Sequence, residues 1–127
     1  MAAGLSAYTA NKFLEAALKA TSFSVTTVYI QLHTATPGAA GTTAVATETT
    51  RKVATFATAS AGSIASNADV TWTAIAGSQT ASFFTAWDAS SAGNFLFSGS
   101  VTGNAYTAGD TFTITSGSLV ASLTVAS

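Results

Sequence analysis

The residues able to do acid–base or nucleophilic chemistry are few and scattered along the chain. His33 is the single histidine, serines are plentiful, and Asp69, Asp88 and Asp110 are available to orient an imidazole ring. A serine nucleophile needs an adjacent base, and in one common arrangement it sits in a Gly-x-Ser-x-Gly turn. The chain contains no such motif. We therefore predict no catalytic triad and no catalytic residue.

Metal binding and glycoside hydrolysis find equally little support in the sequence. One histidine, isolated carboxylates and no cysteine cannot form a closed zinc shell. Asn67 and Asp69 could give oxygen ligands to calcium, but calcium takes six or more. Glycosidases need two neighbouring carboxyl groups, and nothing in the spacing pairs any of Glu15, Glu48, Asp69, Asp88 and Asp110. We predict a non-enzymatic protein with no metal and no cofactor.

The composition is unusually poor in charge. Charged residues make up 7% of the 127 residues, against about 25% in an ordinary domain. Four basic residues and a net charge of −1 give no extended stripe for nucleic acid. No apolar run is long enough to span a membrane, and the N-terminus lacks the basic region of a signal peptide. A net charge near zero favours self-association, so we predict a homo-oligomer, with a monomer solubilised by hydroxyl groups as the alternative.

Residues 1–22 show helical periodicity. An apolar stripe at helical spacing consists of Phe13, Leu14, Ala17 and Leu18. Thr9 or Asn11 is suited to cap the helix, which we expect to end near Thr21. Two arrangements are compatible with this stripe: a helix packed on the sheet of its own domain, or an arm packed on a neighbouring subunit.

Residues 23–127 change to a period of two, which is typical of strands. The predicted strands are Val25–His33, Arg51–Thr58, Asp69–Ile75, Ser82–Asp88, Asn94–Val101, Thr111–Thr115 and Leu119–Val125. Turn clusters separate them, and Ala39–Thr50 is the longest loop. Short strands with regular turns and no βαβ alternation predict a mainly β fold. We expect one domain: an antiparallel β-sandwich, Ig-like or jelly-roll-like, preceded by one α-helix.

The first predicted strand has two chemically distinct faces. Val28, Ile30 and Leu32 share one face, which is apolar. Tyr29, Gln31 and His33 share the other. We predict that this second face is exposed and forms a protein-contact patch.

A second predicted contact patch follows the first strand. It consists of the Ala39–Thr50 loop, with Glu48, and the adjoining Arg51 and Lys52, because half of the basic residues are concentrated beside an acidic one.

The aromatic residues have two possible roles. We expect Trp72 and Trp87 in the sandwich core, together with Phe83, Phe95 and Phe97. If they were exposed, these tryptophans, Tyr29 and Tyr106 could instead stack on sugar rings. Tyr29 is the better surface candidate because it lies opposite the apolar face of its strand.

Five stretches of the chain carry a recognisable pattern: Tyr29–Gly38, Thr49–Lys52, Val70–Trp72, Trp87–Leu96 and Thr107–Phe112. They resemble a family of small virion proteins of tailed phages, common among phages of actinobacteria. Its members are described as tail-fibre, minor tail or head-decoration proteins. The resemblance spans nearly the whole chain. Thr36 departs from the family pattern, which has Asp before the proline, but Thr can also bond to the turn backbone.

The resemblance implies a non-enzymatic component of the virion, made in the host cytoplasm and carried on the outer surface of the particle. We expect a capsid decoration protein that binds the major capsid protein and stabilises the shell. The alternative is a minor tail or tail-fibre protein that binds tail proteins and contributes to host-surface recognition, with a host glycan as ligand.

Overall fold

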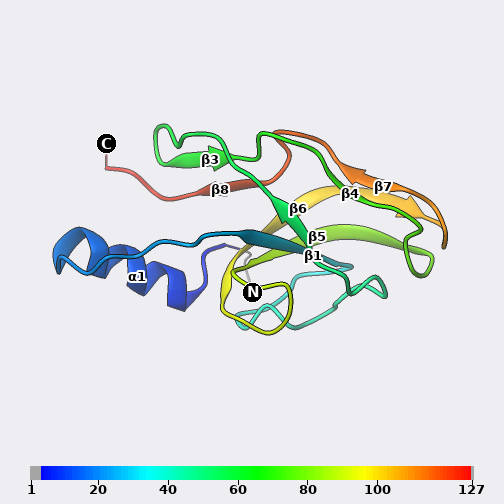
Figure 1. The fold of residues 1–127 in the computed structure, drawn as a ribbon, viewed down its shortest axis with the longest axis horizontal. Helices are drawn as coiled ribbons and strands as arrows, with labels where there is room; N and C mark the ends of the chain where they lie inside the picture. Colours follow the sequence, from blue (N-terminus) through cyan, green and yellow to red (C-terminus); the bar gives the residue numbers. More distant parts are fainter. Residues whose placement is uncertain (1–3, 127) are drawn as a thin grey trace.

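The computed structural model describes residues 4–126; residues 1–3 and 127 of the predicted segments lie outside this range. Within it, one helix and eight strands follow one another along the chain (Figure 1). They are α1 (Ala7–Leu18), β1 (Val28–His33), β2 (Lys52–Ala54), β3 (Ser63–Ala65), β4 (Val70–Trp72), β5 (Gln79–Trp87), β6 (Phe95–Tyr106), β7 (Phe112–Ile114) and β8 (Val120–Ser122). The predicted class is confirmed: the protein is mainly β, with antiparallel sheets and one N-terminal helix.

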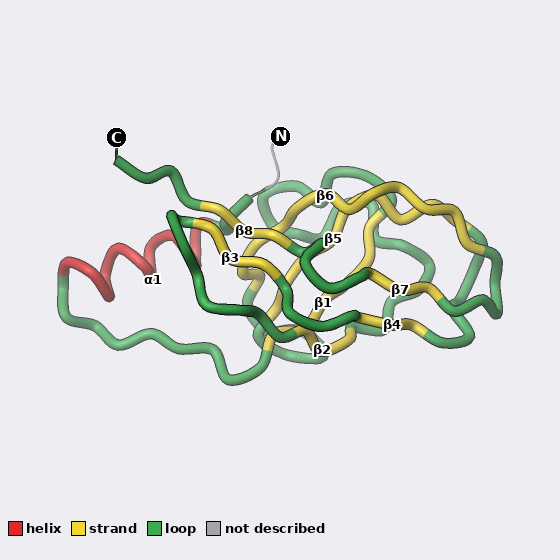
Figure 2. The backbone as a smooth tube through the Cα atoms, turned by 90° about the horizontal axis from the view of Figure 1, so that it is seen from above, coloured by secondary structure: helices red, strands yellow, loops and turns green. Residues whose placement is uncertain are grey.

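The strands form two layers. One layer is an antiparallel sheet in the order β2-β1-β5-β6. The other consists of two ribbons, β3–β8 and β4–β7, which lie above this sheet in Figure 1. Figure 2, seen from above, shows the two ribbons following one another along the length of the sheet. The arrangement is therefore sandwich-like, with a divided second layer.

The hydrophobic core lies between these layers. Ile30, Leu32 and Phe84 project from the inner face of the four-stranded sheet and are fully buried. Trp72 enters from β4 and packs on Phe112 of β7, with 6.1 Å between ring centroids. The period-two pattern thus identified the inner face of β1 correctly, and the prediction that Trp72 belongs to the core is confirmed.

The loop of residues 34–51 covers the opposite face of the sheet. Gly41 lies so close to Phe95 that a Cβ atom here would approach the ring to 2.8 Å, at a φ of +71° that already favours glycine. Because of this cover, Gln31 and His33 are buried, and the prediction that they lie on an exposed face is wrong. Strand alternation shows which residues share a face; it does not show whether a distant loop covers that face.

Seven of the eight strands within residues 4–126 occur where they were predicted, but their lengths differ. β5 begins at Gln79 and β6 continues to Tyr106, so both run through residues predicted as turns or loops. β3 was not predicted, because residues 63–65 become a strand only by pairing with β8, nearly 60 residues later.

The helix begins earlier than predicted. Ser6 Oγ accepts a hydrogen bond from the backbone N–H of Thr9 at 3.1 Å, so Ser6 is the N-cap in place of Thr9 or Asn11. The helix ends at Leu18, and Ala20 follows with a φ of 55°. This left-handed residue ends the helix and turns the chain back toward β1.

Residues 4–6 attach the start of the helix to β6, an edge strand of the sheet. Ser6 N donates to Leu96 O at 2.9 Å, and Ser98 N donates to Gly4 O at 2.8 Å. Beyond this attachment, α1 extends away from the strands (Figure 1). Within residues 4–126, no helix has the length and apolarity needed to cross a membrane.

Gly99 marks a close approach between β6 and the core. A Cβ atom at this position would lie 2.8 Å from Cε1 of the fully buried Phe84. We expect Gly99→Ala to lower the free energy of unfolding by about 1–3 kcal/mol through overpacking. Gly103→Ala is the control in the same strand, because its nearest neighbour would lie 3.6 Å away. Equal losses for the two variants in denaturant unfolding would contradict this account.

Candidate contact surfaces

His33 belongs to a chain of hydrogen bonds beneath the long loop. Its Nδ1 lies 2.8 Å from the Thr43 carbonyl oxygen, and its Nε2 lies 2.9 Å from Thr85 Oγ1. A carbonyl oxygen only accepts, so we assign the proton to Nδ1, and Nε2 then accepts from the Thr85 hydroxyl. The same hydroxyl oxygen accepts from Trp87 Nε1 at 2.7 Å. The network ties the loop to β1 and β5. It keeps Trp87 buried beneath the loop, outside the core between the layers, so the prediction that Trp87 belongs to the sandwich core is wrong.

Arg51 covers the same region from outside. The centre of its guanidinium group lies 4.1 Å from the centroid of the Trp87 ring, in a cation–π arrangement. Its Nη1 donates to the carbonyl oxygens of Ala89 and Ala92, at 2.9 and 2.7 Å. Arg51 therefore fixes the turn between β5 and β6 against the start of β2.

Glu48 holds the long loop to a second turn. Its Oε1 accepts from Ala76 N at 2.9 Å, and its Oε2 accepts from Thr50 N at 3.1 Å. Burial alone would raise the pKa of Glu48, but these backbone hydrogen bonds and the charge of Lys52 together lower it. The side chain is a buried carboxylate that organises two loops.

The six predicted contact residues do not form one exposed patch. Those buried are Gln31, His33 and Glu48. Those partly exposed are Tyr29, Arg51 and Lys52. For the partly exposed residues, a role in protein contacts remains a prediction. For the buried residues, the prediction that they lie on a free surface is wrong. Among the described residues, no three His, Asp or Glu side chains gather into a group that could hold a metal ion.

The burial of His33 makes the stability of the fold depend on pH. Burial is the largest influence and lowers the pKa of His33 below 6.5, the hydrogen bond with Thr43 opposes this, and the charge of Arg51 lowers the pKa further. Below about pH 6.5 the unfolded chain therefore takes up a proton that the folded chain does not.

We expect the free energy of unfolding to be highest above pH 6.5. It should fall toward pH 5, by at most about 1.4 kcal/mol per pH unit. Urea unfolding between pH 5 and pH 8 measures this slope. A His33→Asn variant should lose the part of the slope that lies near pH 6, and an unchanged slope would show that another group titrates.

α1 and the returning segment, residues 19–27, form what we call the arm. Phe23 of the returning segment packs edge-on against Tyr8 and Phe13 of the helix, with ring centroids 6.1 and 6.0 Å apart. These aromatic contacts hold the two halves of the arm together.

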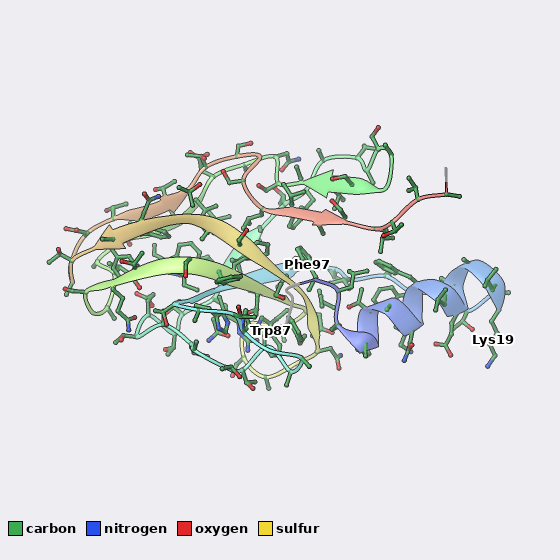
Figure 3. The ribbon with its side chains drawn as sticks, turned by 180° about the vertical axis from the view of Figure 1, so that it is seen from behind. Lys19, Trp87 and Phe97 are labelled. Carbon is green, nitrogen blue, oxygen red and sulfur yellow. The ribbon has the colours of Figure 1, made fainter. Side chains whose placement is uncertain are left out.

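Most of the arm has no partner within its own chain. Thr9 is the one buried residue of α1, whereas Phe13, Leu14 and Leu18 are 39%, 59% and 83% exposed. Figure 3 shows the outer end of the arm, at Lys19, far from the strands. Of the two arrangements that the sequence allowed, the helix packs on its own sheet only at its first turns, and the rest projects as an arm.

The matched family accounts for nearly the whole chain. Residues 4–122 match the family described as podophage GP4 fiber I protein gp80. The chain belongs to this fibre family. The matched region includes the arm and all eight strands. Among curated proteins, none matches the chain.

Membership of the fibre family makes the chain a structural protein of a tailed phage and a component of the virion. Because the family is described as a fibre, it favours the tail-fibre alternative. The main expectation, capsid decoration on the outer head, has no support in this family and is withdrawn. An actinobacterial phage as the source remains a prediction.

Proposed function

We propose that the chain is a non-enzymatic building block of a phage tail fibre that works by associating with other protein subunits. The observation that carries this proposal is the arm, whose leucines are exposed in the single chain. Exposed leucines on a projecting helix are costly unless another surface covers them. Copies of this chain or tail proteins of the same virion are the proposed partners, and the fibre family supports this choice.

The proposed absence of enzymatic activity rests on His33. Both of its ring nitrogens are engaged in internal hydrogen bonds, and its side chain is fully buried. A general base must reach the proton that it abstracts. The one histidine of the chain has no such access.

Direct binding of a host glycan is less well supported than assembly. Sugar rings stack on exposed aromatic faces, but Trp72, Trp87 and Tyr106 are buried. Tyr29 is half-buried. Among the described residues, the one clearly exposed aromatic side chain is Phe13, which lies on the arm. We therefore propose that this chain contributes to the structure of the fibre, and that any host receptor is bound elsewhere on the virion.

Antibody labelling of intact virions tests the proposal. Gold-labelled antibodies raised against the purified chain should bind along the tail fibres in electron micrographs. Label distributed over the head surface would overturn the tail-fibre assignment and would support capsid decoration instead. Virions of a phage that lacks this gene are the control for antibody specificity.

A further inference from the structure

An apolar groove lies beside the arm. Its volume is about 490 Å³, and no charged residue lines it. Thr9 and Phe13 of the helix form one wall, Phe97 forms part of the floor, and Ile64 and Leu123 of the β3–β8 region form the other wall. An engineered apolar cavity of about 150 Å³ holds a benzene molecule, so this groove has room for about two or three large apolar side chains.

The most exposed leucines of the arm cannot enter the groove of their own chain. Successive residues of an α-helix are rotated by about 100°, so Leu14 lies about 140° around the helix axis from Thr9. Leu18 has the same relation to Phe13. Because Thr9 and Phe13 line the groove, the two leucines point away from it. Both halves of an apolar contact are thus present in the chain, but they cannot meet within it.

The exposed apolar area at this end is large enough for an interface. The exposed side chains here are Phe13, Leu14, Leu18, Leu123 and Val125. Together they expose roughly 500 Å², which lies within the about 300–600 Å² of the largest apolar patch on a typical monomer, a patch that is often functional, and is somewhat less than the about 800 Å² per partner of a standard interface. A surface with so little charge also offers no electrostatic opposition to an identical partner.

We propose that the groove receives Leu14 and Leu18 from the arm of a second copy of this chain. This inference rests on the proposed function, because it names the surface through which the building block associates. Each copy supplies an apolar ridge and an apolar groove. The contact covers the leucines, while Lys12, about 120° around the helix axis from Leu18, lies outside it.

Sedimentation velocity of the purified chain over a range of concentrations tests this contact. The natural chain should self-associate, and the double variant Leu14→Gln, Leu18→Gln should raise the dissociation constant at least about tenfold. Gln has nearly the helix propensity of Leu, and both leucines are exposed in the single chain. Circular dichroism of the double variant, and its unfolding midpoint at a concentration at which both chains are monomeric, should therefore stay unchanged. Lys12→Gln, about 120° around the helix axis from Leu18 and about 160° from Leu14, is the matched control and should associate like the natural chain.

Disulfide trapping tests which residues meet. The chain has no cysteine, so single cysteines can be introduced without competition. A mixture of Leu18→Cys and size-tagged Leu123→Cys chains should form the mixed disulfide on oxidation. Lys12→Cys, on the polar side of the helix, should not form it with the same partner.

A natural chain that stays monomeric at every concentration would overturn the inference, as would undiminished association of the double variant. Neither result would overturn the proposed function, because antibody label on the fibres tests that function independently. Association through the arm combined with label on the head would overturn the tail-fibre function and keep the contact.

Discussion

Replacing Glu48 with alanine is expected to lower the free energy of unfolding by about 1–3 kcal/mol. The substitution removes the acceptor from two backbone N–H groups, those of Ala76 and Thr50. Both hydrogen bonds are part-buried and their donors belong to exposed residues, so water can partly replace the lost acceptor, and each bond contributes about 0.5–1.5 kcal/mol. Urea unfolding at pH 7 measures the loss.

Glu48→Gln separates the charge from the hydrogen bonds. Its amide oxygen can accept one of the two N–H groups, but its NH₂ group faces the other donor. We therefore expect a loss between those of the natural chain and the alanine variant. Because the pKa of Glu48 is lowered in the folded chain, the carboxylate stabilises the fold above about pH 4.5 and ceases to do so as the pH falls below that value. The Gln variant should lose this acid-side dependence, and an equally stable Ala variant would show that the two loops are held by other contacts.

Thr85→Val is expected to cost more, about 2–5 kcal/mol. The Thr85 hydroxyl donates to His33 Nε2 and accepts from Trp87 Nε1. All three side chains are buried, so valine leaves an acceptor and a donor without partners. Valine nearly preserves the volume of threonine, which limits the loss to the hydrogen bonds.

Thr71→Val is the control for this substitution. Its hydroxyl also bonds to a neighbouring side chain, that of Thr113 at 3.2 Å, but Thr71 is exposed and water can replace the bond. A change within about 0.5 kcal/mol is expected. If both variants lost the same free energy, the loss at Thr85 would reflect strand propensity and not the buried network.

The sequence was sufficient to predict the elements of the fold that depend on local pattern. The period-two alternation marked the inner face of β1, and the turn residues separated most strands correctly. β3 escaped prediction because its pairing with β8 is a long-range contact. The burial of Gln31 and His33 escaped for the same kind of reason, since a loop without any periodicity covers them.

The sequence does contain a sign that the arm is exposed, because the apolar stripe of α1 is wider than a helix packed on one surface needs. At 100° per residue, the apolar residues of α1 from Ala16 through Phe13 and Leu14 to Leu18 span an arc of about 200°. A helix packed on one surface needs an apolar stripe of only somewhat more than about 100°. The excess indicates two apolar partners. No pattern of residues, however, distinguishes a head protein from a fibre protein, and that distinction came from the matched family.

The attachment of residues 4–6 to β6 determines which hydrogen bonds of the fold bear a mechanical force applied to the arm. At one end the arm is held by backbone hydrogen bonds to Leu96 and Ser98, and at the other it continues directly into β1 (Figure 1). β1 is bonded on both sides, to β2 and β5. Tension along the arm would thus run parallel to these strands and load several hydrogen bonds at once in shear, instead of opening them one after another. When a subunit is held by its arm, the force therefore passes into β1, an inner strand of its largest sheet.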